Sequence, residues 1–253
     1  MRLTFLGTGT SQGIPVIACT CPVCQSDDAK DKRLRVSVLI EVNGKNFVID
    51  SGPDFRQQML REKVDTLDAI LFTHEHKDHI SGMDDVRAYN FRSKRPMDVY
   101  ASEAVQAALK REYHYIFEPD PYPGVPRVNL HTVGTEPFSV DGIPIVPVKV
   151  MHYQMPVLGF RIGDLAYVTD AKTISAEEKE KLKGCKVLVL NALRKAPHIS
   201  HLNLAEALEW IDELKPERAY LTHISHLMGK HILVNEELPV GVQIAYDGLK
   251  VLV

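Results

Sequence analysis

Three histidines and one aspartate occupy six consecutive positions of the segment Thr73–His79, which reads THEHKDH. They are His74, His76, Asp78 and His79, and they directly follow the apolar run AILF. Imidazole nitrogens and carboxylate oxygens are ligands that zinc, manganese and iron accept. A solvated polar loop has no reason to collect four such groups, whereas a loop leaving a strand can turn them inward. We therefore predict that this segment binds metal.

Three further ligand candidates follow apolar runs elsewhere in the chain. His152 ends the run IPIVPVKVMH, Asp170 ends LAYVTD and His223 ends RAYLTH. Asp50 also follows a strand-like run, NFVI, but it opens a helix-like segment. We expect Asp50 to order the metal-binding loop rather than to bind metal.

Cys19, Cys21 and Cys24 form a second cluster with the spacing C-x-C-x-x-C. A structural zinc site needs four ligands, and the composition does not name the fourth. The alternative is a group of buried reduced cysteines, which behave as small apolar residues. Cysteines this close together are poor candidates for disulfides in a reducing compartment but good ligands for a soft metal. Cys185 lies outside the pattern and is expected in the core.

Short strand-like runs recur along the chain and supply most of the expected framework. They are RLTFL, VSVLI, NFVID, AILFT, PMDVY, IPIVPVKV, LGFRI, LAYVTD, KVLVLN, RAYLTH and VQIAY. Helical spacing appears at residues 53–61, 102–111, 176–182 and 202–214. Asn43-Gly44 predicts a tight antiparallel hairpin, which disfavours a purely parallel doubly wound sheet.

Two loops with unusual composition need separate interpretation. GTGTSQG near the N-terminus lacks the third glycine of a dinucleotide-binding fingerprint, because Gln12 stands there, so we read it as a tight loop. Residues 118–127, EPDPYPGVPR, form an irregular loop that is either a lid facing the substrate or a plain connector.

Size and composition fit one large domain or two small ones, and we expect a single α+β domain covering residues 1–253. The chain is 45% hydrophobic and carries a formal net charge of −3, which gives no overall basic field for a nucleic-acid backbone. DNA is not an expected partner, and RNA is disfavoured. The N-terminus does not resemble a secretion signal, and no apolar run is long enough for a membrane helix. We expect a cytoplasmic protein without membrane contact.

THEHKDH, with a distant histidine, an aspartate after a strand and a late histidine, resembles the metallo-β-lactamase superfamily over nearly the whole chain. The resemblance implies a four-layer αββα sandwich, with two mixed β-sheets between outer helices and metals at one edge. It implies that His74, His76 and His152 hold one metal, that Asp78, His79 and His223 hold a second, and that Asp170 bridges them. Two adjacent cations can supply a hydroxide near neutral pH and stabilise negative oxygens, so hydrolysis is expected.

The cysteine cluster, together with His223-x-x-His226, resembles a narrower branch, the cyclic phosphodiesterases of the carbon-phosphorus lyase pathway. This resemblance implies a structural zinc held by Cys19, Cys21, Cys24 and His226, and two active-site metals that are manganese or zinc. It implies attack by metal-bound hydroxide on phosphoribosyl 1,2-cyclic phosphate or a 2′,3′-cyclic nucleotide. Asp78 would be essential to catalysis. A homodimer is the expected assembly.

SHLNLAEAL resembles the segment that carries the proton donor in superfamily phosphodiesterases, which favours His201 over His198 as general acid. Arg194 is a candidate for neutralising a substrate phosphate. Two alternatives stay open. One is an RNA 3′-end-processing endonuclease, which only the basic stretch 87–95 supports. The other is a metal-dependent binding module without catalysis. Thioester or β-lactam hydrolysis would use the same ligands. His114, His131 and His231 are assigned structural or surface roles.

Overall fold

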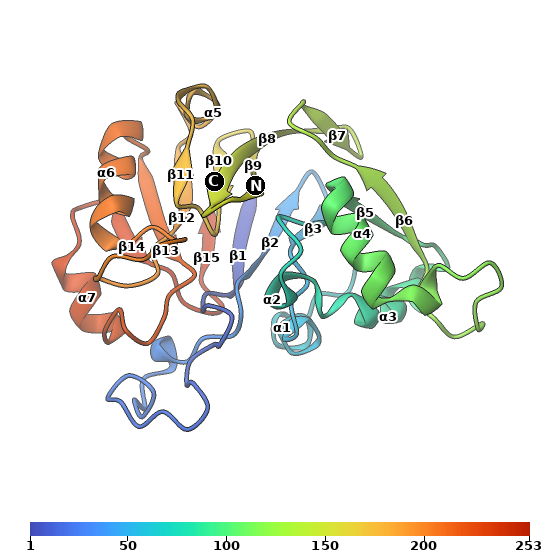
Figure 1. The fold of residues 1–253 in the computed structure, drawn as a ribbon, viewed down its shortest axis with the longest axis horizontal. Coiled ribbons are helices and arrows are strands. Elements are labelled where there is room, and N and C mark those ends of the chain that lie inside the picture. Colours follow the sequence, from blue (N-terminus) through green and yellow to red (C-terminus); the bar gives the residue numbers. More distant parts are fainter.

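The computed structural model describes all residues, 1–253, and contains two mixed β-sheets packed face to face (Figure 1). The first sheet runs in the order β15 (Lys250–Leu252), β1 (Arg2–Gly7), β2 (Ser37–Val42), β3 (Lys45–Ile49), β4 (Ala69–Leu71), β5 (Met97–Ala101) and β6 (Val128–Thr132). The second runs β11 (Thr173–Ile174), β8 (Ile143–His152), β9 (Met155–Ile162), β10 (Leu165–Val168), β12 (Val187–Asn191), β13 (Arg218–Thr222) and β14 (Val242–Ile244), with β7 (Phe138–Val140) paired to β8.

Helices lie on the outer faces of both sheets, as the labels in Figure 1 show. They are α1 (Phe55–Glu62), α2 (Lys77–Ile80), α3 (Arg87–Ser93), α4 (Glu103–Glu112), α5 (Ala176–Glu180), α6 (Leu204–Leu214) and α7 (His231–Glu237). No helix combines the length and apolar composition needed to cross a bilayer. The predicted αββα sandwich is confirmed.

Strand residues alternate between two cores, which explains why the central strands are apolar throughout. Ala69 and Leu71 of β4 face the opposite sheet, while Ile70 between them packs under the helices. In β12, Val189 belongs to the core between the sheets, and Leu188 belongs to the core beneath α6. Each sheet is therefore buried on both faces.

The predicted hairpin joins β2 to β3, with Val42 opposite Lys45. Asn43 and Gly44 both have positive φ, at 51° and 76°, which is the conformation of a tight two-residue turn. The four predicted helices are present, and none of their ends differs from the prediction by more than two residues. α6, for example, begins at Leu204 rather than Leu202, because Asn203 and Glu206 form a capping box.

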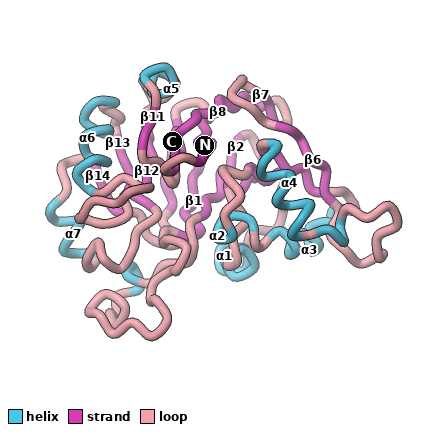
Figure 2. Tube along the Cα trace, in the orientation of Figure 1, coloured by secondary structure: helices cyan, strands magenta, loops and turns pink.

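Strand direction fixes where the site lies. β3, β4, β5 and β6 are parallel, and so are β10, β12, β13 and β14. β8 runs in the direction of β10, because each is antiparallel to β9. The segments that leave these strands at their carboxyl ends therefore meet at one edge of the sandwich. The long segment between β1 and β2, drawn mostly as loop in Figure 2, extends past the same edge.

Candidate metal centre

Asp50 anchors the loop that carries the first four ligand candidates. It follows β3 with φ 63° and has no solvent exposure. One carboxylate oxygen accepts the backbone N–H of Thr73 at 2.8 Å, and the other accepts the Thr73 hydroxyl at 2.8 Å and lies 2.7 Å from His79 Nδ1. These bonds confirm that Asp50 orders the loop, and they turn Nε2 of His79 away from Asp50.

Close backbone packing holds α2 against the segment after β3. A Cβ atom placed on Gly52 would lie 2.0 Å from the Asp78 carbonyl oxygen. Only glycine permits this approach. Asp78 and His79 are consequently presented from the first turn of α2, while His74 and His76 precede the helix.

The second sheet presents three more candidates at the same edge. Asp170 and His223 follow β10 and β13 and adopt positive φ, at 57° and 56°. Asp170 lies between a histidine of each sheet, since its carboxylate oxygens are 3.5 Å from Nε2 of His79, which follows the first sheet's β4, and 3.3 Å from Nε2 of His223, which follows the second sheet's β13. His152 ends β8, and its Nδ1 donates to the Ser200 carbonyl at 2.9 Å, which leaves Nε2 free.

The structure gathers these side chains into three overlapping groups. Within each group, the ligand atoms lie within 4.8 Å of one another. The groups are His74, His79 and Asp170; Asp78, His79 and His223; and His152, Asp170 and His201. His76 is in none of these groups, but its ring centroid lies 4.7 Å from that of His74 and 5.3 Å from that of His152. All seven predicted ligand residues thus come together, and His201 joins them.

Several ring nitrogens in this cluster are buried without a hydrogen-bond partner. They are Nε2 of His74, Nε2 of His79, Nδ1 of His201 and both nitrogens of His223. Buried polar atoms are almost always satisfied in native proteins, so this concentration of unpaired nitrogens marks a place built for cations. Imidazoles combined with carboxylates accept both zinc and manganese.

The pKa values within the cluster are shifted by burial and by the charges of neighbouring histidines and aspartates. Burial raises the pKa of Asp170, but the neighbouring His223 and His79 outweigh it and hold that pKa below its ordinary range. Burial lowers the pKa of His79, while Asp50 and Asp170 outweigh burial and hold it well above its usual value. Burial and His223 lower the pKa of His201 to about 3.

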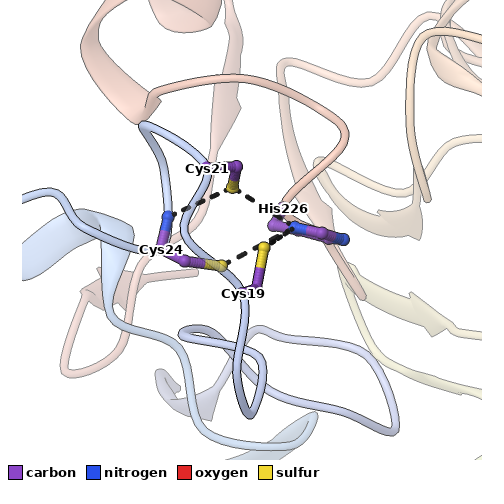
Figure 3. A group of neighbouring side chains, drawn as sticks. All are labelled: Cys19, Cys21, Cys24 and His226. Atoms are coloured by element: carbon purple, nitrogen blue, oxygen red, sulfur yellow. Dashed lines mark hydrogen bonds between the residues drawn. The ribbon is translucent and has the colours of Figure 1, made fainter.

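The cysteine cluster is a separate metal-binding arrangement at the end of the long N-terminal loop (Figure 3). The Sγ atoms of Cys19, Cys21 and Cys24 lie 3.3, 3.4 and 3.6 Å from Nδ1 of His226. Tetrahedral zinc with ordinary bond lengths would place sulfur and nitrogen about 3.6 Å apart. Three thiols and one imidazole at these separations fit zinc, and Figure 3 shows His226 reaching them from a C-terminal loop.

A pocket of about 250 Å³ opens beside both clusters. Its lining consists of residues 10–12, four residues of the segment 193–201 and four of the segment 223–227. His201, His223 and Arg194 are among them. The larger cavities, of about 400 and 360 Å³, lie around α1 and α3 and contain no histidine or cysteine. The pocket lined by His201 and His223 is therefore the candidate substrate site.

Sequence reasoning missed part of this lining. Thr10, Ser11 and Gln12 belong to the loop predicted only as a tight turn, and Ser225 lies between the two C-terminal histidines. Backbone bonds between Ile224 and both Thr8 and Thr10 bring the first loop to the pocket. Such tertiary contacts leave no local pattern, although proximity of Ser225 to His223 and His226 was a usable signal.

The remaining predicted positions lie outside the pocket. The loop 118–127 is irregular, as predicted, and lies beyond α4 and β6 at the far end of the first sheet (Figure 1). Residues 87–93 of the basic stretch 87–95 form α3, where Arg87 pairs with Asp84 and Arg92 with Asp65. His114 is exposed, His131 pairs with Asp98, and Cys185 is buried in the core.

Residues 45–224 match the family described as the beta-lactamase superfamily domain. The chain belongs to this superfamily. The fold and the convergence of imidazoles and carboxylates at the sandwich edge define a protein of the metallo-β-lactamase type with a candidate metal centre.

Two relatives are similar over the entire chain. A solved structure described as a new diphosphatase from the PhnP family is 41% identical, covers 100% of this chain and 97% of its own, and superimposes with a TM-score of 0.93. Octanoyltransferase of Porphyromonas gingivalis (strain ATCC BAA-308 / W83) is 42% identical over 256 residues, and this chain spans 52% of its length. Zn(2+)-bound PqqB from Methylobacterium extorquens, 18% identical with a TM-score of 0.81 and full coverage of both chains, shares the fold.

Proposed function

We propose that the protein is a dinuclear-metal phosphodiesterase that hydrolyses a small cyclic phosphodiester. The observation that carries the proposal is the convergence of seven imidazole and carboxylate side chains beside a pocket that holds His201 and Arg194 but no carboxylate. Phosphoribosyl 1,2-cyclic phosphate and 2′,3′-cyclic nucleotides are substrates of suitable size and charge for it. At about 250 Å³ the pocket is smaller than most drug-sized ligand sites.

The proposed metal assignment follows the two sides of the cluster. His74, His76 and His152 would hold one divalent cation, Asp78, His79 and His223 the other, and Asp170 would contact both. When bound, such a pair lowers the pKa of water and stabilises negative charge on phosphate oxygens. Manganese and zinc are the candidates. The cysteines and His226 would hold a structural zinc.

The chain's own residues then orient the substrate and supply the proton. His201 lines the pocket next to the ligand cluster, with its Nδ1 3.7 Å from Asp170 and its ring centroid 4.4 Å from that of His152. Its place at the rim suits protonation of the departing sugar oxygen. An anionic phosphate bound there raises the pKa of the imidazole, which is the direction a general acid requires.

A diphosphate linkage is the second candidate, because the PhnP-family relative at 41% identity is described as a diphosphatase. The same side chains would serve, since both reactions replace an oxygen at phosphorus. The RNA 3′-end nuclease is less well supported, because Arg87 and Arg92 of the basic stretch are paired to aspartates and none of its arginines lines the pocket.

Rates on a defined panel test the proposal. The metal-loaded protein should hydrolyse adenosine 2′,3′-cyclic phosphate or bis(p-nitrophenyl) phosphate, and Asp78→Ala should lose that activity while keeping its circular dichroism spectrum. Inorganic and nucleoside diphosphates, precursor tRNA and an octanoyl thioester complete the panel, the last because of the Porphyromonas relative's description. Preferential hydrolysis of the thioester, or of tRNA, would overturn the phosphodiesterase proposal.

A further inference from the structure

The pocket beside the cluster contains one permanent cation. Arg194 lines it, and none of the other lining residues is a lysine, an arginine or a carboxylate. The rest of the wall is made of hydroxyls, an amide, imidazoles and two leucines. A pocket with one positive charge and no negative charge suits an anionic ligand.

Arg194 has no carboxylate partner, although nearby lysines do. Lys172 pairs with Glu206 at 2.6 Å and Lys195 with Glu237 at 2.5 Å, whereas Arg194 forms no salt bridge. Its Nε and Nη2 donate to the carbonyls of Ala196 and Pro197 at 3.3 and 2.8 Å. Nη1 makes no hydrogen bond within the protein. A guanidinium has five donors, so several of them are available to a ligand.

Backbone hydrogen bonds close the loop that carries Arg194, and the carbonyls of Ala196 and Pro197 in this loop hold the guanidinium. Leu193 N–H donates to the Leu202 carbonyl at 2.9 Å, and Leu204 N–H donates to the Arg194 carbonyl at 2.9 Å. The same loop carries His198, whose ring centroid lies 5.2 Å from that of His201. A fixed arginine loses little entropy when it binds phosphate in the bidentate manner that its shape favours.

We propose that Arg194 binds a second anionic group of the substrate, a phosphate monoester in addition to the phosphodiester that is cleaved. The inference rests on the proposed function, because the imidazole and carboxylate cluster and His201 are assigned to the scissile phosphate. Arg194 then selects phosphorylated sugars or nucleotides over unphosphorylated cyclic phosphodiesters. It is a specificity residue, and its loss acts mainly on KM.

The test compares adenosine 2′,3′-cyclic phosphate with its 5′-phosphorylated form. Wild type should prefer the 5′-phosphorylated substrate, and Arg194→Met should reduce kcat/KM for it about 10- to 100-fold more than for the unphosphorylated one, a charged hydrogen bond's usual contribution. Arg194→Lys should restore part of the difference. Lys195→Met, next in sequence and outside the pocket, is the matched control. Equal losses on both substrates, or no preference in wild type, would overturn the proposal.

A binding measurement separates this inference from the proposed function. If wild type hydrolyses neither substrate with its metals bound, the phosphodiesterase proposal fails, and titration calorimetry with ribose 5-phosphate decides the role of Arg194. Binding that weakens at least tenfold in Arg194→Met but not in Lys195→Met supports the anion subsite. Absent binding, or equal affinity in all three proteins, refutes it.

Discussion

Asp50 makes three short contacts from a fully buried position, two to Thr73 and one to His79. In Asn an NH2 group replaces one of the two carboxylate oxygens, so that at one of these contacts two hydrogen-bond donors would face each other. Asp50→Asn should therefore weaken binding of divalent metal about 10- to 100-fold, the usual effect of losing a carboxylate that orients a histidine ligand. Metal titration followed by calorimetry measures this. Asp98→Asn, which changes an exposed pair with His131, should bind metal as wild type does.

His201 is assigned the proton transfer, and that role depends on the leaving group. A p-nitrophenolate departs without protonation, whereas a sugar alkoxide does not. His201→Asn should thus lower kcat about 10²- to 10⁴-fold on cyclic nucleotides and much less on bis(p-nitrophenyl) phosphate. His114→Asn, at an exposed position, is the control. Equal losses on the two substrates would remove His201 from the proton transfer.

At the scale of elements, the sequence predicted the strands well and the site's surroundings less well. Runs such as VLVLN are apolar at every position because both faces of β12 are buried, so the signal is strong. β6, β7, β11 and β15 were missed. β7, β11 and β15 have two or three residues each, and β6 has no buried residue. α2 has only four residues, two of which, Asp78 and His79, belong to the metal cluster, so no helical periodicity is present.

The candidate ligands were found because they directly follow strands, and strand ends are fixed by topology. The pocket wall formed by residues 10–12 was not found, since it depends on backbone bonds to Ile224, more than two hundred positions away. For His76, the motif did not predict the position within the cluster. His76 belongs to the THEHKDH segment, yet its ring lies at the margin of the cluster, beside the rings of His74 and His152.

The contact between Gly52 and Asp78 gives a test at the level of packing between elements. In Gly52→Ala the new methyl group would overlap the Asp78 carbonyl, so α2 must move. Overpacking of this kind costs about 1 to 3 kcal/mol of folding stability. We expect weaker metal binding at the sandwich edge and unchanged metal at the cysteines, measured by elemental analysis after dialysis. Gly134→Ala, where no atom lies within 4 Å, should resemble wild type.

Across the whole molecule, the cysteine cluster joins an N-terminal loop to a C-terminal one over about two hundred residues. Because metal binding there adds to folding free energy, Cys21→Ser should lower the melting temperature and remove one equivalent of zinc. Hydrogen exchange should rise in residues 10–35. Cys185→Ala, at a buried cysteine outside the cluster, should keep the full zinc content. Unchanged zinc in Cys21→Ser would contradict the structural site.

A second set of contacts between the N-terminal loop and a C-terminal segment predicts that folding stability depends on pH. The His231 backbone N–H donates to Asp31 at 2.7 Å, and its ring Nδ1 lies 3.3 Å from Arg33 Nη2. A guanidinium only donates, so Nδ1 must accept and the ring must be neutral. Burial and the Arg33 charge lower the pKa of His231 to about 4, from an ordinary value of 6.5.

The unfolded chain therefore takes up this proton first as the pH falls. The contribution of His231 to stability is complete above about pH 7 and is lost progressively between 6.5 and 4. At pH 5 the loss is about 1 to 2 kcal/mol. Urea unfolding of wild type and His231→Gln at pH 7 and 5 measures it, and an identical pH dependence in both proteins would exclude His231 as the cause.

The two chain ends meet at the opposite edge from the metals. Val253 N–H donates to the Met1 carbonyl at 3.0 Å, where β1 begins and β15 finishes. Strand direction puts this meeting point a full strand length from His74 and His223. A partner module could consequently be tethered through either terminus, or the ends joined and the chain reopened in the loop 118–127, without obstructing substrate entry.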